Sequence, residues 1–402
     1  MIWLFWISGA LLAIAWLRAA LPMVWHLSEL ADLTQPQHAV PPATPLPSLT
    51  IVVPARNEDL HIEPALRSLL QLDYPHYEVV AVNDRSTDQT GAIMDRLAAE
   101  SGASGKLRVL HIKELPPRWL GKLHAMWLGS LRDASLRNAS LGNAAQQGTS
   151  EWLLFTDADC VFHPECLSRA VHFAVREKLD HLVIMPTLLT RSLGERILTA
   201  FPQVVAGFVM RPWKLRDPRA RDHVGAGAFN LIRRSAYEAI GAYEKLRLEV
   251  VDDLKLGQSI KQAGLRQDLA VGHGLVSLHW GAGIAGLIAN LEKNMFAVLQ
   301  FRLSLVLAAC VATFMLCIWP FVGLALAPGW SRVPFAVAVA AIAVAYLPIK
   351  RYTSGSPWLF ITCPISASLF IVALLRSTAV ALRDGAVTWR GTKYPLEELK
   401  NK

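Results

Sequence analysis

The chain has 402 residues, of which 53% are hydrophobic, and its mean hydropathy is +0.32. These values are too apolar for an ordinary soluble protein. The formal net charge of +8 fits the positive-inside bias of a membrane protein better than it fits a nucleic-acid-binding protein. We therefore expect a membrane, and no nucleic acid, among its partners.

The first apolar segment, residues 2–25, carries a single charged residue, Arg18. It is long enough to cross a bilayer. A cleavable signal peptide would need a basic stretch before the apolar core and a small-residue cleavage site after it, and neither is evident. We expect residues 1–25 to be a transmembrane anchor, followed by a stiff linker over residues 26–47, which contain five prolines.

From residue 48 onward, short apolar runs alternate with segments of helical periodicity. The pattern predicts strands over residues 49–53, 77–82, 107–112 and 152–155, and helices over 61–70, 88–99 and 122–131. Mostly apolar strands joined by helices indicate a largely parallel sheet covered on both faces. We expect an α/β domain over residues 48–302.

Polar residues follow three of these strands, at the sheet edge where ligands of parallel sheets collect. They lie in residues 54–58 (PARNE), 83–88 (NDRSTD) and 156–159 (TDAD). Asn57 and Asp88 are equally well explained as turn or capping residues. The acidic residues of the other positions predict a binding site at this edge.

Asp157 and Asp159 come directly after a buried strand, and Lys and Arg are absent from their neighbourhood in sequence. In an extended segment, residues two apart project to the same side. Such a pair invites a hard divalent cation, which would let an acidic site bind an anionic diphosphate. A solvated acidic loop is the alternative.

A second acidic pair, Asp252 and Asp253, opens a helix expected to end near Gly264. Carboxylates at a helix start suit the helix dipole and can be simple caps. Adjacent carboxylates can also form a general base, because one positions its neighbour or raises the pKa of its neighbour. Both interpretations stay open from the residues alone.

Three more apolar blocks, residues 303–331, 333–349 and 352–375, lie toward the C-terminus. They predict a membrane region over residues 303–382 with two or three spans and a basic tail over 383–402. Basic residues beside the spans place the middle domain in the cytoplasm. Three spans would put the basic tail on the opposite side, so residues 333–349 are a candidate for not crossing.

Five groups of residues carry a resemblance to a known family. They are, in chain order, 51–58 (IVVPARNE), 82–90 (VNDRSTDQT), 121–122 (GK), 157–159 (DAD) and 252–253 (DD). This ordered set resembles family 2 glycosyltransferases of the GT-A fold over about residues 48–274. The anchors and the tail residues 385–394 (GAVTWRGTKY) resemble most the membrane enzymes that glycosylate lipids, such as the hopanoid-associated, carotenoid and ceramide types.

The resemblance implies a nucleotide-sugar donor, expected to be a UDP-sugar, and a lipid acceptor. The residues that would bind substrates are Pro54, Ala55, Arg56, Glu58, Asp84, Lys122, Asp157 and Asp252. Of these, the loop of residues 54–58 and Asp84 would bind the nucleotide base and ribose. Lys122 would contact the diphosphate, and Asp157 would contact the ribose or the sugar. Asp159 would bind Mg²⁺ or Mn²⁺, and Asp253 would be the catalytic base. Position 252 is Asp where the family usually has Glu.

The same resemblance implies a single inverting hexosyl transfer at a plasma (inner) membrane. Processive members carry a Gln-x-x-Arg-Trp motif, and residues 299–303 (LQFRL) do not match it. This mismatch argues against a polysaccharide synthase, which stays as an alternative, as does a membrane scaffold with a degenerate transferase domain. A nucleotidyltransferase would normally have a glycine-rich basic loop after the first strand, which residues 54–58 lack.

Overall fold

The computed structural model describes residues 2–42, 44–100, 105–131, 150–281, 283–348 and 355–400, which group into two compact units. The sheet unit comprises residues 31–187 and 214–278, and the helical unit comprises residues 1–30, 188–213 and 279–400. Residues 188–213 and 279–302 were expected in the α/β domain. Their contacts place them instead in the helical unit, with the terminal helices. The expected domain limits at 25, 47, 302 and 382 stay predictions about function and membrane position.

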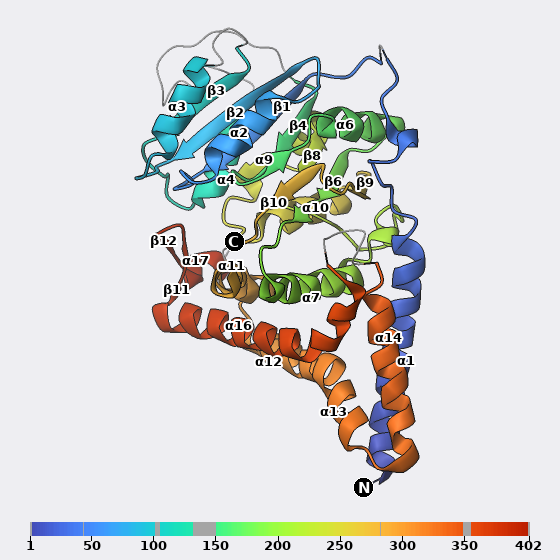
Figure 1. The fold of residues 1–402 in the computed structure, drawn as a ribbon. Helices are drawn as coiled ribbons and strands as arrows, with labels where there is room; N and C mark the ends of the chain where they lie inside the picture. The colour runs from blue at the N-terminus through green and yellow to red at the C-terminus, as the bar shows by residue number, and fades with distance from the viewer. Residues whose placement is uncertain are drawn as a thin grey trace. The chain divides into compact units, whose positions relative to one another are not determined.

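The sheet unit contains a seven-stranded sheet in the order β3-β2-β1-β4-β8-β6-β9 (Figure 1). Its strands are β1 (Leu49–Ala55), β2 (Tyr77–Asp84), β3 (Leu107–Ile112), β4 (Trp152–Phe155), β6 (His181–Met185), β8 (Asn230–Arg233) and β9 (Gln267–Val271). β8 runs antiparallel to both β4 and β6, and the other pairings are parallel. A three-stranded sheet joins β5 (Val161–Phe162), β10 (Val276–Leu278) and β7 (Thr187–Leu188).

Helices connect the strands of this unit. They are α2 (Ile62–Leu70), α3 (Thr90–Glu100), α4 (Gly121–Ser130), α6 (Cys166–Arg176), α8 (Arg234–Ala239), α9 (Ala242–Lys245) and α10 (Asp252–Gln262). All seven residues of β1 are buried, so both faces of the sheet are covered at its centre. The expected α/β class with a mostly parallel sheet is confirmed, and so are the four strands and three helices expected before residue 156.

The segment expected to be a stiff linker contributes to the sheet. Residues 31–33 pair in parallel with β9, through the N–H of Leu33 to the carbonyl of Val271 and the N–H of Val271 to the carbonyl of Ala31, both 2.8 Å. A short 3₁₀ helix, η1 (Pro36–His38), follows, and its His38 is buried. The linker is therefore anchored at the end of the sheet formed by β9.

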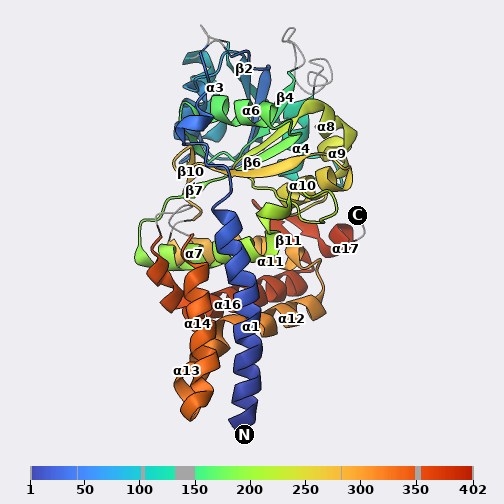
Figure 2. The same cartoon turned by 90° about the vertical axis from the view of Figure 1, so that its right-hand side faces the viewer.

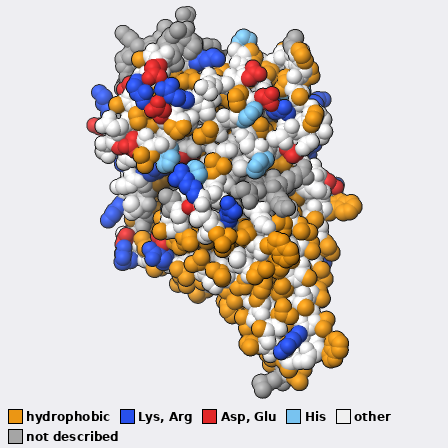
Figure 3. All heavy atoms as spheres, viewed as in Figure 1, with side chains coloured by type: hydrophobic (Ala, Val, Ile, Leu, Met, Phe, Trp, Pro, Cys, Tyr) orange, Lys and Arg blue, Asp and Glu red, His pale blue; other side chains and the backbone are white. Residues whose placement is uncertain are grey.

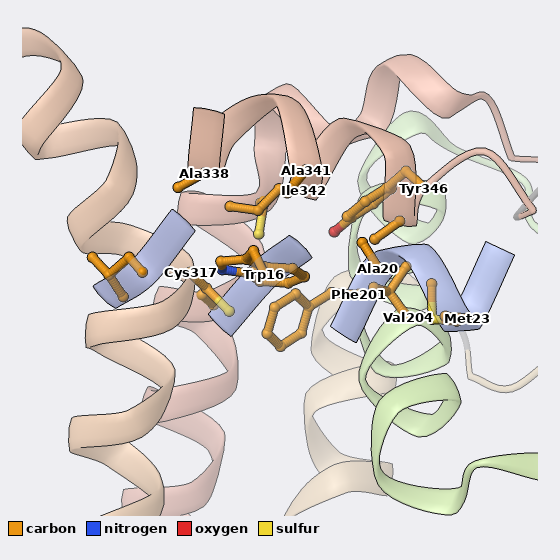
Figure 4. Close-up of a cluster of buried hydrophobic side chains, with 14 of the residues drawn as sticks. Trp16, Ala20, Met23, Phe201, Val204, Cys317, Ala338, Ala341, Ile342 and Tyr346 are labelled. Atoms are coloured by element: carbon orange, nitrogen blue, oxygen red, sulfur yellow. The ribbon is translucent and has the colours of Figure 1, made fainter. Parts of the chain in front are cut away.

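The helical unit is built mainly from apolar helices (Figures 1 and 2). They are α1 (Ile2–Leu27), α7 (Leu193–Met210), α11 (Gly283–Val298), α12 (Leu303–Thr313), α13 (Trp319–Leu326), α14 (Val333–Ala345) and α16 (Cys363–Asp384). Shorter elements are η2 (Pro212–Lys214), η3 (Phe314–Ile318), η4 (Gly329–Arg332), η5 (Pro357–Thr362), β11 (Ala386–Trp389), β12 (Thr392–Pro395) and α17 (Leu396–Lys400). Its core joins side chains of α1, α7, η3, α14 and α16 (Figure 4).

Three helical segments of the described chain are long and apolar enough to cross a membrane, Ile2–Leu27, Leu303–Leu326 and Pro357–Asp384. Gly329–Ala345 is a shorter apolar helix. Hydrophobic side chains cover much of the surface of these helices (Figure 3). Apolar helices at both ends of the chain, as expected from the sequence, are confirmed.

Candidate active site

The parallel pairing of β1 with β2 and β4 aligns the ends of three strands. Ala55 lies opposite Asn83, and Val52 lies opposite Phe155. The segments that follow these strands therefore leave the sheet at the same edge, as expected from the sequence. α4 packs against β1 and β2 beside them.

Lys122, in the first turn of α4, is the centre of the charge cluster at this edge. Its Nζ lies 2.7 Å from Oδ1 of Asp157 and 3.5 Å from Oδ2 of Asp252. These carboxylates raise the pKa of Lys122 against the opposing effect of burial, so the ammonium stays charged. A cation that is distant in sequence thus pairs with Asp157, where the sequence showed none nearby.

Asp84, the last residue of β2, is buried and lies against the start of α4. Its carboxylate accepts hydrogen bonds from Nε and Nη2 of Arg85 at 2.7 and 3.2 Å, and Nη1 of Arg56 lies 4.0 Å away. A Cβ at Gly121 would lie 2.2 Å from Oδ2 of Asp84, so glycine is required for this close approach. Arg85 was missed in the sequence analysis, and the left-handed backbone that it adopts (φ +56°) is not visible in a sequence.

Asp157 and Asp159 lie in a turn and not in the extended segment considered in the sequence analysis. The N–H of Cys160 donates to the carbonyl of Asp157 at 3.4 Å, which closes the turn. Burial, Asp157 and Glu58 together raise the pKa of Asp159 to about 6. The predicted metal-binding carboxylate therefore lies in a region of excess negative charge.

The excess negative charge around Asp159 indicates whether a divalent ion would be stable there. A cation at Asp159 would relieve the repulsion from Asp157 and Glu58 that raises the pKa of this carboxyl. Among the described residues, no group of three or more His, Cys, Asp or Glu side chains is arranged to hold a metal. Mg²⁺ and Mn²⁺ suit such a site, because they are commonly held by one or two carboxylates together with substrate phosphates and water.

Asp253, the predicted base, is held by two backbone N–H groups. Its Oδ2 accepts from Gly227 at 3.1 Å and its Oδ1 accepts from Leu254 at 2.8 Å. A Cβ at Gly227 would lie 2.4 Å from Oδ2 of Asp157, and the carbonyl of Gly227 accepts from the N–H of Asp157 at 3.0 Å. The small residues of the 225–230 segment thus connect Asp157 with Asp253.

Asp252 is buried beside its neighbour at the start of α10. Burial raises the pKa of Asp252 to about 7, with Asp253 and Asp157 adding to the rise and Lys122 opposing it. The pair at residues 252–253 begins the helix, but Asp252 contacts Lys122 and Asp253 contacts Gly227. It does more than cap a helix.

Two residues of the loops after β1 and β2 have structural roles. Asn57 adopts φ +54°, and its Oδ1 accepts from the N–H of Thr87 at 2.8 Å. Asp88 accepts from the N–H groups of Asp59 and Thr90 at 3.2 and 2.9 Å. The turn and capping interpretation that was left open for Asn57 and Asp88 is therefore what the structure shows.

An aromatic cluster on α4 was also missed. The buried imidazole of His124 contacts the rings of Trp119 and Trp127, with centroids at 5.3 and 6.1 Å, and these two rings contact each other at 5.2 Å. Burial lowers the pKa of His124 to about 4, so the ring is neutral at pH 7.

Comparison with known proteins agrees with this arrangement. Residues 47–272 match the family model described as "Glycosyltransferase like family 2". A 4,4'-diaponeurosporenoate glycosyltransferase of Staphylococcus aureus strain bovine RF122 / ET3-1 is 23% identical over 362 residues, which cover 87% of this chain and 89% of that protein. The enzyme of the same name from strain MRSA252 is 22% identical with the same coverage.

A solved structure shares the fold. The mannosyltransferase PcManGT from Pyrobaculum calidifontis, in complex with GDP-Man and Mn²⁺, has a TM-score of 0.50 and 21% sequence identity, and the match covers 94% of this chain and 99% of that chain. The family match spans more than half of the residues. On the strength of that match and of the GT-A arrangement, the chain belongs to the family described as Glycosyltransferase like family 2 and is a glycosyltransferase.

Proposed function

We propose that this enzyme transfers one hexosyl unit from a nucleotide sugar to a hydroxyl of a membrane lipid, with inversion at the anomeric carbon. The observation that carries the proposal is the contact of Lys122 with both Asp157 and Asp252, beside a carboxylate, Asp253, held by two N–H groups. One site would thus combine Lys122, a cation that can bind a diphosphate, with Asp253, a carboxylate oriented to act as a base.

The donor site is proposed at the ends of β1 and β2. Residues 54–58 and Asp84 would bind the base and ribose, since Asp84 and Arg56 are brought together there. Lys122 would bind the diphosphate and would exchange part of its pairing with Asp157 for phosphate oxygens, while Asp157 turns to the ribose or sugar. A UDP-sugar is the donor that the family resemblance favours.

Asp253 is proposed as the general base. Its two backbone donors fix the carboxylate plane, so it can take the proton from an acceptor hydroxyl as that oxygen attacks the anomeric carbon. A single displacement inverts the configuration and needs no covalent intermediate, unlike retaining glycosidases. Asp252, with a raised pKa, would position Asp253 and Lys122.

Asp159 is proposed to hold Mg²⁺ or Mn²⁺. When bound, the ion would neutralise negative charge on the departing nucleotide diphosphate. The Mn²⁺ and GDP-Man of the mannosyltransferase that shares the fold agree with this proposal. Chelation of divalent ions should abolish transfer, and Asp159→Asn should raise the metal concentration needed for half-maximal activity.

The acceptor and the location are proposed from the helical unit. Apolar helices that could cross a membrane support a multi-pass protein of the plasma (inner) membrane with its catalytic domain in the cytoplasm. The glycosyltransferases that match most of the chain are named for 4,4'-diaponeurosporenoate. A lipid of the carotenoid type is therefore the first acceptor to test.

That name also favours a second candidate reaction, because it denotes a carboxylate. A carboxylate oxygen can attack the anomeric carbon without losing a proton, so transfer to it would not need a base. Asp253→Asn distinguishes the two: it should leave transfer to a carboxylate acceptor nearly unchanged and should reduce transfer to a hydroxyl by about 10²–10⁴-fold.

The test is to incubate membranes holding the full-length enzyme with labelled nucleotide sugars and to extract the lipids. Label in the lipid fraction, lost in Asp253→Asn but kept in the matched control Asp73→Asn, is expected. Asp73 is an exposed carboxylate of the sheet unit, outside the proposed site. Label confined to a water-soluble polymer would contradict the lipid acceptor, and equal labelling with both variants would contradict the assignment of the base.

A further inference from the structure

α16 is apolar enough to cross a membrane by composition, but its direction differs from that of α1 and α14. In both views α1 and α14 run side by side, whereas α16 runs across them (Figures 1 and 2). A helix that crosses other membrane-spanning helices at such an angle cannot also span the bilayer. The three lie in one compact unit, so their relative directions are defined.

Contacts show that α14 is parallel to α1. Near the start of both helices, a Cβ at Gly9 would lie 3.0 Å from Cβ of Pro334. At the other end, Tyr346 belongs to the same buried cluster as Ala20 and Met23 (Figure 4). The chain therefore leaves α14 at the same end of α1 as the linker to the sheet unit.

α13 and α14 are the two arms of a helical hairpin, and η4 forms the turn between them. The ring of Trp319 in α13 stacks on Phe5 at 6.5 Å, and a Cβ at Gly323 would lie 2.4 Å from the ring of Phe335. The turn between the arms contains Trp330, which is 82% exposed. With α1 and this hairpin as spans, the chain crosses the membrane three times before α16 and returns to the side of the linker.

α16 itself packs along α7 and α11. Ser366 donates to the carbonyl of Ile197 at 3.1 Å, and Phe370 contacts Phe201 with ring centroids at 5.5 Å. Farther along, Ser377 accepts from the N–H of Phe296 in α11 at 3.2 Å. Half of α16 thus lies against helices that are not transmembrane candidates.

The connection to α11 fixes its side of the membrane. Residues 279–282 alone join β10 to α11, and the five steps from Leu278 to Gly283 reach at most about 18 Å, which is well short of a hydrocarbon core of about 30 Å. α11 therefore begins on the side of the sheet unit. Because α16 packs along α11, its C-terminal half lies on that side too.

Charge on α16 also opposes a crossing. Arg376 is 64% exposed and pairs with Glu292 of α11, and Arg383 is 74% exposed. A span over 357–384 would place Arg376 about 8 Å from its centre, which is inside a hydrocarbon core about 30 Å thick, where a charged side chain is costly. At a bilayer surface the same arginines would meet anionic headgroups.

We propose that α16 lies flat in the membrane surface, with its exposed apolar residues among the lipid acyl chains and its arginines at the headgroups. The apolar residues are Ile365, Val372, Leu375, Val380 and Leu382. The tail, residues 385–400, then lies on the same side as the sheet unit. This places Arg383, Arg390 and Lys393 on the cytoplasmic side, as the positive-inside rule expects. Three C-terminal spans would instead place these basic residues on the opposite side.

The short hairpin fits this arrangement. α14 has 13 residues and is about 20 Å long, which is less than the hydrocarbon core. Helices lying in the interface enter the bilayer by about 5–10 Å and would occupy the remaining depth.

The proposal depends on the proposed membrane location but not on the catalytic assignments. Labelling with a membrane-impermeant maleimide tests the sides. Lys245→Cys reports the sheet unit, Trp330→Cys reports the hairpin turn and Lys393→Cys reports the tail; all three positions are exposed. The five native cysteines are buried or half-buried, and the unaltered protein gives their background.

In sealed membrane vesicles of each orientation, Lys245→Cys and Lys393→Cys should react from the same side and Trp330→Cys from the other. If Lys393→Cys and Trp330→Cys instead react from the same side, the proposal is overturned. Labelling of Lys245→Cys and Trp330→Cys from one side would instead refute the membrane location itself.

Depth measurement tests the orientation of α16. Nitroxides at Ile365→Cys and Leu382→Cys, in vesicles of phosphatidylcholine and phosphatidylglycerol, should report similar shallow depths from collisions with oxygen and a nickel chelate. A spanning helix would separate these labels by about 25 Å along the membrane normal, and that result would overturn the proposal.

Discussion

Gly227→Ala tests whether the position of Asp157 governs catalysis. Gly227 has a backbone conformation that alanine can adopt, so the change adds a methyl group without backbone strain. That Cβ would lie 2.4 Å from Oδ2 of Asp157, and real Cβ contacts essentially never fall below 3.0 Å. The carboxylate must therefore retreat by at least 0.6 Å, the difference between these two values.

The movement disturbs the ion pair with Lys122, whose Nζ lies 2.7 Å from the other oxygen of Asp157. A displacement approaching 1 Å at a reacting site costs about 10²-fold in rate, equal to about 2.7 kcal/mol of transition-state stabilisation. We expect kcat/KM to fall by about 10²-fold. Stability should change little, because Asp157 is 40% exposed and can move toward solvent.

The assay is the initial rate of sugar transfer to extracted lipid, together with the Tm of the purified enzyme. Gly194→Ala is the matched control, since its Cβ would crowd the end of Ile284 at 2.6 Å, in the helical unit. Its Tm should change little, because Ile284 is 43% exposed and the end of its side chain can move, and its kcat/KM should be unchanged. A kcat/KM within twofold of the unaltered enzyme in Gly227→Ala would refute the reasoning.

Three further outcomes are expected. Burial holds the pKa of Asp252 at about 7 against an ordinary 3.8, so the folded chain keeps a proton that the unfolded chain releases. The stability linked to this group is therefore present at low pH and lost as pH rises from about 4 to 7. Asp252→Asn should flatten that fall in Tm. Arg234 is buried and donates to two backbone carbonyls and a serine hydroxyl, so Arg234→Met should lower the free energy of unfolding by about 3 kcal/mol, whereas the neighbouring and more exposed Arg233→Met should cost less than about 1 kcal/mol in the same denaturant titration. Gly9→Leu should separate α1 from α14, because even a Cβ there would lie 3.0 Å from Pro334; a lower Tm in detergent is expected, and an unchanged Tm would contradict the close packing of the two helices.

The sequence was informative where local chemistry decides structure. Apolar runs such as residues 49–53 predicted the strands, because β-branched residues that are buried on both faces have few other places in a fold. The candidate residues could be chosen because they follow such strands, and parallel pairing then brings them to one edge. The glycosyltransferase family was predicted from the same residues and is confirmed.

Other features depend on contacts that sequence patterns do not contain. The pairing of Lys122 with Asp157 joins residues far apart in the chain, and the antiparallel insertion of β8 between β4 and β6 leaves no local pattern. The orientation of α16 could not be predicted either, because apolar composition is similar for a helix that crosses a membrane and one that lies in its surface. The roles of the site residues remain predictions for the experiments above.

The pairing of residues 31–33 with β9 has a consequence for biosynthesis. These residues are among the first of the sheet unit to leave the ribosome, and their partner Val271 in β9 belongs to the last strand of the main sheet to be made. Until β9 is synthesised, the hydrogen-bonding groups of this segment have no sheet partner, and an unpaired strand edge is prone to aggregation. Completion of the sheet is therefore a late event in translation, and truncation before β9 should leave a nascent chain that depends on chaperones.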